Sequence, residues 1–416
     1  MVLLSLLEDI IMRMLNDSNT NWLGNIPAEW SIGRIGQLYS ERRVKVSDTE
    51  YMPLSVTMKG VVPQLSTAAK TDAHDDRKLV RKGDFAINSR SDRRGSCGIS
   101  EYDGSVSLIN TILAPRKSMS PRYYNWLFHT SEFAAEFYKW GHGIVDDLWT
   151  TNWNDMKRIL VPVPSLLEQE RIADFVDRKC ADIDNILEKT RASIEEYRKL
   201  KQSVITKTIY HEDCSLSKLK YYGSFVNGYA FKSDSFKDAG TRVIKIANIQ
   251  TGTLSWEDES FVDNSLYDQL TSFQVHKGDV VFALTRPIIS GGIKTAIVDT
   301  KEKLLLNQRN AMFIGSKSLN NRYLYYTMQS QPFIKEFKLR IDLTGLQPNI
   351  STNSIANIAI PYRTILEQDS VVSYLDRKCA EIDSLINNKE KFIVELEAYR
   401  KSLIYEYVTG KKEVVS

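Results

Sequence analysis

Two stretches of the sequence combine arginine with small polar residues. They are NSRSDRRGS, residues 88–96, and ALTRPIISGG, residues 283–292. Arginine can pair in a bidentate manner with guanine O6 and N7, and it also binds phosphate. Both stretches are therefore candidates for contact with DNA, the alternative being solvated surface loops. The candidate residues are Asn88, Ser89, Arg90, Arg93, Arg94, Thr285 and Arg286.

A second pair of stretches mixes glycine, amide, acidic and aromatic residues further along the chain. These are GHGIVDDLWTTNW, residues 141–153, and LTGLQPNIST, residues 343–352. Aspartate can accept a hydrogen bond from cytosine N4, and glutamine can pair with adenine. We therefore add His142, Thr344 and Gln347 to the candidate DNA-binding residues, again against the alternative of solvated loops.

Motifs for catalysis are missing from the sequence. It contains no G-x-x-x-x-G-K-[ST] phosphate loop, no H-E-x-x-H and no zinc-finger spacing. It also lacks an Asn-Pro-Pro-aromatic run, and its five histidines are dispersed. We expect a binding protein without its own cofactor or metal. A methyltransferase or nuclease with an unrecognised active site stays open as an alternative, because folds assemble sites from distant residues.

The elements that would position these stretches are indicated by an internal repeat. DRKCADID, residues 177–184, returns 199 residues later as DRKCAEID, and residues 162–205 match residues 361–404 at 15 of 44 positions. Each copy opens with a capping box, formed by Ser165 with Glu168 and by Thr364 with Glu367. Both copies therefore predict a helix that starts at the same place in the repeat.

Apolar positions in each copy then step by four and three residues, as in a coiled coil. No proline or glycine interrupts the second copy before Gly410, which is suited to a helix C′ position. Each helix should run for about 40–45 residues, or roughly 60–68 Å. We expect the two helices to pack antiparallel with each other, the alternative being pairing with other chains. Cys180 and Cys379 occupy this stripe as small buried residues.

The blocks before each helix are also related. Both carry a Lys-Gly-Asp turn followed by a β-rich run, and both later have a helical run with Phe133 and Phe137 or Phe333 and Phe337 in register. The predicted fold class is α+β, with two mixed globular blocks separated by two long antiparallel helices. The expected boundaries are an extension at 1–17, a first block at 18–161, a helix at 162–212, a second block at 213–361 and a helix at 362–416.

Charge and composition limit the class of protein. Residues 18–160 hold 19 Lys/Arg against 16 Asp/Glu, and residues 213–361 hold 17 against 13, which favours an anionic partner for the blocks. The four scattered cysteines do not predict disulfides, and no apolar run is long enough for a membrane span. Glu8 and Asp9 interrupt the apolar N-terminus, so we expect no signal peptide and a cytoplasmic location.

With these features the sequence resembles the DNA-specificity subunits of type I restriction-modification systems. WLGNIPAEW, residues 22–30, is similar to the opening of that family's first target-recognition domain. The repeated LLEQERIADFVDRKCADID and ILEQDSVVSYLDRKCAEID are similar to its two helices. The likeness extends over nearly the whole chain, although Val371 replaces an isoleucine of the helix motif in the second copy.

The resemblance implies a recognition subunit that binds a split target in double-stranded DNA, with one block per half-site and the helices setting the gap. It also implies two docked modification subunits with S-adenosylmethionine, and ATP-dependent restriction subunits with Mg²⁺. A scaffold protein without a DNA role is the competing class. The predicted docking and helical-spacer residues are Glu168, Gln169, Asp177, Arg178, Lys179, Glu367, Gln368, Asp376, Arg377 and Lys378.

Overall fold

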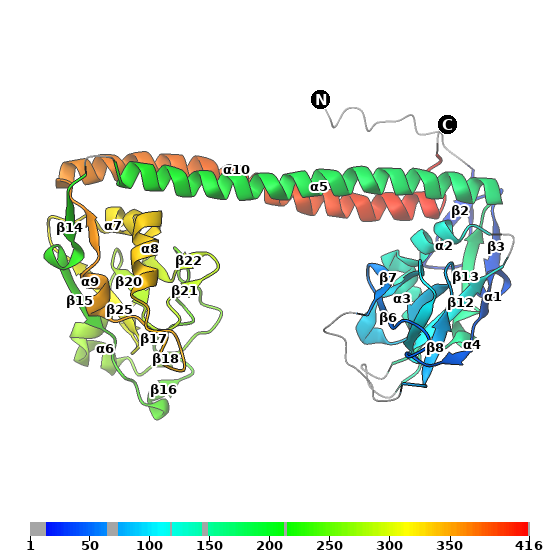
Figure 1. Cartoon of the computed structure of the whole chain (residues 1–416), viewed down its shortest axis with the longest axis horizontal. Coiled ribbons are helices and arrows are strands. Elements are labelled where there is room, and N and C mark those ends of the chain that lie inside the picture. Colours follow the sequence, from blue (N-terminus) through cyan, green and yellow to red (C-terminus); the bar gives the residue numbers. More distant parts are fainter. Residues whose placement is uncertain (1–13, 65–73, 117–118, 144–148, 212–213, 415–416) are drawn as a thin grey trace. The chain divides into compact units, whose positions relative to one another are not determined.

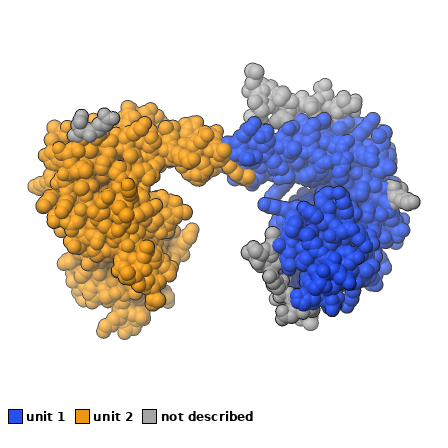
Figure 2. Space-filling view, viewed as in Figure 1, with its two compact units in different colours: residues 1–189, 391–416 blue, residues 190–390 orange. Residues whose placement is uncertain are grey.

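The computed structural model describes residues 14–64, 74–116, 119–143, 149–211 and 214–414. The chain divides into two compact units, shown in different colours in Figure 2. Unit 1 combines Met1–Lys189 with Lys391–Ser416, and unit 2 is Thr190–Glu390. Each unit therefore holds one globular block and a part of both long helices. Residues 1–13 of the predicted N-terminal extension lie outside the described residues.

Unit 1 is built on antiparallel strands. Its largest sheet has the strand order β10-β9-β12-β4, and smaller ones are β11-β8-β5, β13-β3, β6-β7 and β1-β2. The strands are β1 (Leu15–Asp17), β2 (Asn25–Pro27), β3 (Ser31–Arg34), β4 (Tyr39–Glu41), β5 (Lys45–Val46), β6 (Leu54–Thr57), β7 (Gly60–Pro63), β8 (Arg77–Val80), β9 (Phe85–Asn88), β10 (Cys97–Ile99), β11 (Gly104–Ser107), β12 (Asn110–Pro115) and β13 (Leu160–Val163). The short helices are α1 (Ile35–Leu38), α2 (Pro121–Phe128), α3 (Ser131–Lys139) and α4 (Trp153–Met156).

Unit 2 repeats the four-stranded sheet as β15-β25-β20-β23 and adds a five-stranded sheet, β16-β18-β17-β24-β19, in which β17 and β24 are parallel. The strands are β14 (Leu216–Lys218), β15 (Gly223–Asn227), β16 (Phe236–Lys237), β17 (Thr241–Ile244), β18 (Phe261–Val262), β19 (Gln274–Val275), β20 (Val280–Ala283), β21 (Ile288–Ile289), β22 (Gly292–Ile293), β23 (Thr295–Ile297), β24 (Leu304–Leu306), β25 (Asn310–Gly315) and β26 (Ala359–Pro361). The short helices are α6 (Ser265–Gln269), α7 (Asn321–Gln329), α8 (Gln331–Leu339) and α9 (Thr352–Ala356).

Two long helices have the lengths that the sequence predicted. They are α5 (Leu166–Ile209) and α10 (Ile365–Val408), each of 44 residues. In the second capping box Thr364 N donates to Glu367 Oε2 at 2.8 Å, and Glu367 N donates back to Thr364 Oγ1 at 3.4 Å. Gly410 follows the end of α10 with φ of +71°, a left-handed conformation that glycine adopts without strain.

Antiparallel pairing of α5 and α10 is confirmed within each unit (Figure 1). In unit 1 the ring of Phe175 lies 4.4 Å from that of Tyr407, and Arg400 pairs with Asp184 at 3.1 Å. The stripe positions of both helices are buried or half-buried throughout, including Cys180 and Cys379. The helices thus cover their apolar faces within one chain, which is what we expected in preference to pairing with other chains.

The same pairing continues in unit 2. Lys201 Nζ lies 2.7 Å from Asp383 Oδ2, and Arg198 Nη2 lies 3.1 Å from Glu390 Oε1. Both ion pairs are exposed, so they contribute little to stability and mainly fix the register of the helices.

The main core of each unit joins the sheet, two short helices and the long helices. In unit 1 the rings of Phe133 and Phe137 on α3 are fully buried beside Val176 of α5 and Val408 of α10. The equivalent core of unit 2 contains Phe333 and Phe337 of α8, Leu375 of α10 and Ile209 of α5. The α+β fold with repeated blocks is therefore confirmed, and each block is packed directly onto the helices.

Candidate nucleic-acid interface

Both candidate stretches of unit 1 meet where strand β9 ends. Thr151 N donates to Ser89 O at 3.0 Å, and Ser91 N donates to Trp149 O at 3.1 Å. Two segments far apart in the sequence therefore form one surface, which we call loop cluster 1. It comprises residues 88–96, 142–143 and 149–151; residues 144–148 of the predicted stretch lie outside the described residues.

Aromatic residues hold loop cluster 1 in shape. The hydroxyl of Tyr138 donates to Asn88 O at 3.1 Å and approaches Arg93 O at 3.3 Å. Trp149 Nε1 donates to Tyr138 O at 2.7 Å. These residues border a groove of about 620 Å³, whose lining includes Arg94 and Lys139. Sequence reasoning did not single out Tyr138, Lys139 or Trp149, because their role depends on contacts between distant segments.

The arginines of loop cluster 1 are exposed. Arg94 lies over the ring of Tyr138 at 5.6 Å, and Arg93 lies 3.5 Å from the carboxylate of Asp92. Among the described residues, no carboxylate forms an ion pair with Arg90 or Arg94. His142 is exposed as well, with Nε2 3.4 Å from Asp155. The cluster can therefore offer cations and planar side chains to an anionic partner.

Asn88 and Ser89, unlike the arginines, are buried. They are 9% and 5% exposed. Asn88 Oδ1 accepts a hydrogen bond from Arg90 N, and the hydroxyls of Ser89 and Thr111 lie 3.0 Å apart. They fix the loop from inside, the arginines lie at its surface, and contact of Asn88 and Ser89 with DNA stays a prediction.

Unit 2 brings its two candidate stretches together in the same way. Ile350 N donates to Leu284 O at 2.9 Å, and Arg286 N donates to Pro348 O at 2.8 Å. Asp342 and Asn349 exchange backbone hydrogen bonds at 2.7 and 3.0 Å, as His142 and Thr150 do at 3.0 Å in unit 1. We call residues 284–293 and 341–350 loop cluster 2. The repeat in the sequence thus extends to the framework of the loops.

Candidate side chains in loop cluster 2 divide between surface and interior. Arg286 is exposed and has a φ of +48°, a strained conformation for arginine. Thr344 is exposed, and both its N and Oγ1 donate to Asp342 Oδ1, while Gln347 is half-buried. Thr285 is 5% exposed and donates to Asn349 Oδ1 at 2.6 Å. Thr285 therefore positions the loop, and its contact with DNA stays a prediction.

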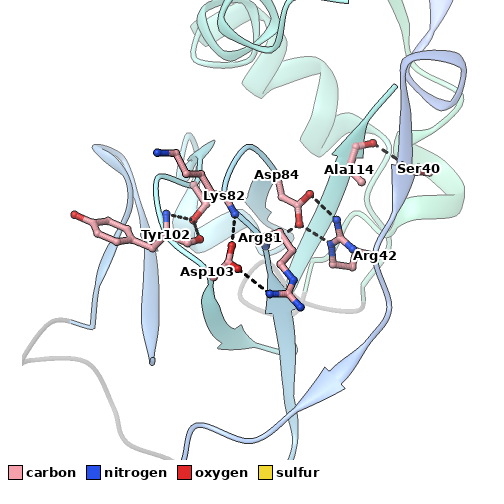
Figure 3. A network of polar contacts seen from close by, with 9 residues as sticks. Ser40, Arg42, Arg81, Lys82, Asp84, Tyr102, Asp103 and Ala114 are labelled. Atoms are coloured by element: carbon pink, nitrogen blue, oxygen red, sulfur yellow. Dashed lines mark hydrogen bonds and ion pairs between the residues drawn. The ribbon is translucent and has the colours of Figure 1, made fainter. Parts of the chain in front are cut away.

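The turn that leads into β9 is fixed by a buried carboxylate. Asp84 accepts from Arg42 Nε at 2.6 Å and from Arg42 Nη2 at 3.0 Å, and it also accepts from Arg81 N (Figure 3). The hydrogen bond to Asp84 raises the pKa of Arg42. Gly83 has a φ of +89°, so the predicted Lys-Gly-Asp turn is confirmed. This turn holds the strand whose far end carries loop cluster 1.

Aspartates of the repeated DRK motif fasten the long helices to their own blocks. Asp177 accepts from Arg122 Nη1 at 2.9 Å and from Trp126 Nε1 at 2.6 Å. Its counterpart Asp376 accepts from Arg322 Nε and from the hydroxyl of Tyr326, both at 2.6 Å. These aspartates are engaged within the chain and belong to the spacer part of the prediction.

The glutamines of the repeat are also internal. Gln169 and Gln368 are each 1% exposed. Gln169 Oε1 accepts from Ser120 N, and Gln368 Oε1 accepts from Asn320 N, both at 2.8 Å. They join each long helix to the short helix beside it, as spacer residues would, and their contact with another subunit stays a prediction.

Other residues of the predicted docking set lie nearer the surface. Glu168 accepts from Trp30 Nε1, and Glu367 closes its capping box. Lys179 and Lys378 are half-buried, whereas Arg178 and Arg377 are exposed at matching places in α5 and α10. For these residues subunit docking stays a prediction.

The chain is similar over almost its full length to a curated protein. The type I restriction enzyme MjaVIII specificity subunit of Methanocaldococcus jannaschii is 27% identical over 437 residues, which cover 97% of this chain and 98% of that protein. This similarity to a type I restriction enzyme specificity subunit extends over both units of the chain.

Further comparisons give relatives of the same kind. The EcoAI specificity subunit of Escherichia coli is 32% identical over 176 residues, covering 41% of this chain and 28% of that protein. A solved chain from a study of assembly and conformational transition in the type I R-M system matches with a TM-score of 0.73 at 15% identity, covering 92% of this chain and 98% of its own. No protein-family model matches the sequence.

The fold is also that of the HsdS subunit from Thermoanaerobacter tengcongensis, with a TM-score of 0.55 at 16% identity and coverage of 95% of this chain and 99% of the other chain. In the described ranges of the chain, acidic, histidine and cysteine side chains form no group of three that could hold a metal ion. None of the helices that the structure describes is long and apolar enough to span a membrane.

Proposed function

We propose that this specificity subunit reads a bipartite DNA target, with loop cluster 1 on one half-site and loop cluster 2 on the other. One observation carries the proposal: equivalent strands, β9 and β20, end in loops that the same pattern of backbone hydrogen bonds joins to a second loop. Phosphate contacts would fix the position of each unit on the duplex, and a few side chains would read base edges.

The long helices set the distance between the half-sites in this proposal. Each has 44 residues, and each contributes to both units. A helix of that length spans roughly 66 Å. Because α5 and α10 are paired and fastened to the blocks by Asp177 and Asp376, the spacing would be a property of the helices and not of the loops.

Two modification subunits would dock on the exposed face of the helices. The exposed Arg178 and Arg377 occur at equivalent places, so the chain offers the same feature twice. The modification subunits would carry S-adenosylmethionine, and restriction subunits, where they join, would bring ATP and Mg²⁺.

Methylation in a host genome tests the proposal. The chain would be co-expressed with the modification subunit encoded beside it, in a host without other adenine methylation, and methylated sites would be read by single-molecule sequencing. We expect one motif with two unlike half-sites separated by a fixed unspecified gap. Methylation without such a motif, or in a host that lacks this chain, would contradict the proposal.

A further inference from the structure

Loop cluster 2 carries an apolar tip. Leu343 and Leu346 are 73% and 107% exposed. They lie in the loop that the backbone pair of Asp342 and Asn349 closes. Exposed leucines that occur singly need no explanation, but two on one short loop within a candidate binding surface indicate contact with a partner.

Hydrogen bonds within the cluster hold this loop, although Asp342, Thr344 and Asn349 are themselves exposed. Asp342 accepts from Thr344, Asn349 Oδ1 accepts from Thr285, and Asn349 Nδ2 donates to Gln347 O at 2.8 Å. The backbone is therefore fixed while the leucine side chains project. Such a loop loses little conformational freedom on binding, which favours affinity.

Two exposed cations, Arg286 of loop cluster 2 and Lys338 shortly before the loop in the sequence, favour an anionic partner. Arg286 is exposed and its backbone N donates to Pro348 O of the same loop. Lys338, at the end of α8, is exposed as well. Among the described residues, no carboxylate forms an ion pair with Arg286 or Lys338. A loop cluster with exposed leucines and an exposed arginine would suit a DNA groove, where phosphates flank the base edges.

The two loop clusters differ in chemistry at matching positions. Trp149 and Pro348 occupy equivalent places. In unit 1 the backbone oxygen of Trp149 accepts a hydrogen bond from Ser91 N, and in unit 2 that of Pro348 accepts one from Arg286 N. Among the described residues, loop cluster 1 has three exposed arginines, and loop cluster 2 has one arginine and the leucine tip. Leucine cannot form hydrogen bonds to bases, and the 5-methyl group of thymine is the apolar feature of the major groove.

We infer that Leu343 and Leu346 contact thymine methyl groups in the half-site that unit 2 reads, while Arg286 contacts the adjoining phosphates. This inference rests on the proposed function, because it assigns a specificity-determining role within that DNA contact. It predicts that part of this half-site is read by the presence of a methyl group rather than by hydrogen bonds.

The experiment removes the thymine methyl group from the DNA and, separately, the leucine side chain from the protein. The full chain, in complex with its modification subunit, would be titrated with a duplex carrying the motif found in the host genome. Each thymine of the motif would be replaced in turn by deoxyuridine. For the wild-type chain we expect about a fourfold loss of affinity at one or more thymines of the unit 2 half-site, as for one buried methyl group.

Leu343→Ala and Leu346→Ala make the corresponding change in the protein, so that the two changes can be combined. We expect each variant to bind the thymine duplex more weakly, and at least one of them to show no further loss with deoxyuridine. Leu216→Ala is the matched control, because Leu216 is 56% exposed in strand β14 of the same unit. Thermal unfolding of each variant checks that the fold is retained, and Leu→Gln at both positions provides second variants of similar size.

Several results would overturn the inference. The first is equal affinity of the wild-type chain for thymine and deoxyuridine duplexes throughout this half-site. The second is an unchanged DNA affinity of the leucine variants. The third is that the leucine variants bind the modification subunit more weakly but keep their affinity for DNA. Failure of the wild-type complex to prefer the motif duplex over a scrambled one would instead contradict the proposed function.

Discussion

Arg94 illustrates how a single residue can be prepared for recognition. Its guanidinium lies over the ring of Tyr138, whose hydroxyl is held by backbone oxygens of loop cluster 1. The arginine is thus positioned before a partner arrives, and less side-chain entropy is lost on binding. Arg90 has no such ring contact among those described and is exposed beside it.

Removal of these arginines should weaken DNA binding in a way that depends on their role. If Arg90→Ala removes a phosphate contact, the slope of log affinity against log salt should fall by about 0.9. If Arg94→Ala removes a base contact, one position of the unit 1 half-site should lose about 1–3 kcal/mol of discrimination. Fluorescence anisotropy over a salt series measures both effects.

Arg43→Ala is the control for these variants. Arg43 is exposed in the same unit and pairs with Glu41 outside the loop cluster. Equal losses for Arg43, Arg90 and Arg94 would mean that general positive charge, and not loop cluster 1, attracts the DNA.

For single residues, the sequence indicated which side chains have suitable chemistry for DNA, but not which of them are buried. The arginines were chosen as candidates because their chemistry suits DNA, and the structure exposes them. Asn88, Ser89 and Thr285 were placed on the surface because their inward partners, such as Thr111 and Asn349, lie elsewhere in the sequence. Burial of a polar side chain depends on tertiary contacts that a local pattern does not contain.

The strand turn before β9 offers a test of how an element is stabilised. Arg42→Met would leave the buried carboxylate of Asp84 without its bidentate partner. Because Arg42 is partly exposed, we expect a loss of about 2–3 kcal/mol in the free energy of unfolding, typical of hydrogen bonds to charged groups. Urea unfolding should show the change in the transition of unit 1.

Arg43→Met is the matched control for this variant. Arg43 forms an exposed ion pair, which should contribute at most about 1 kcal/mol. A similar loss for both substitutions would show that the buried pair has no special role.

The length of the helix pair is the element-scale property with a direct functional consequence. Insertion of seven residues after both Ile194 and Ile393 keeps the apolar stripe in register. It lengthens the pair by about 10.5 Å, or roughly three base steps. We expect the methylated motif to keep both half-sites and to change the gap between them, as measured by sequencing of methylated genomes.

Insertion in α5 alone is the control. It shifts the stripe against α10, so we expect lower stability and little methylation. An unchanged gap after the double insertion would mean that the helices do not set the spacing.

Elements were largely predictable from the sequence, for physical reasons. Capping residues and an uninterrupted stripe determined the starts and lengths of α5 and α10, because both signals are local. The fastening of Asp177 to Arg122 and Trp126 was not predicted. The charged DRK motif indicated solvated surface, with docking to another subunit as the alternative, and the partners of Asp177 within the chain lie some 50 residues earlier.

At the scale of the whole molecule, the repeated architecture predicts that the two halves read DNA independently. Exchange of residues 18–160 for the equivalent block of another specificity subunit should alter one half-site only. The helices and loop cluster 2 stay unchanged, so the gap and the other half-site should be retained. Sequencing of methylated sites would reveal this, and a change in both half-sites would contradict independent reading.

The junction of the two ends of the chain in unit 1 bears on how the protein is made. The hydroxyl of Tyr405 donates to Trp22 O at 3.0 Å, and Lys411 Nζ donates to Leu23 O at 2.8 Å. Unit 2 is one continuous segment and can fold as soon as it leaves the ribosome. Unit 1 begins first but must wait for the last residues to be translated, so the second recognition domain should mature before the first.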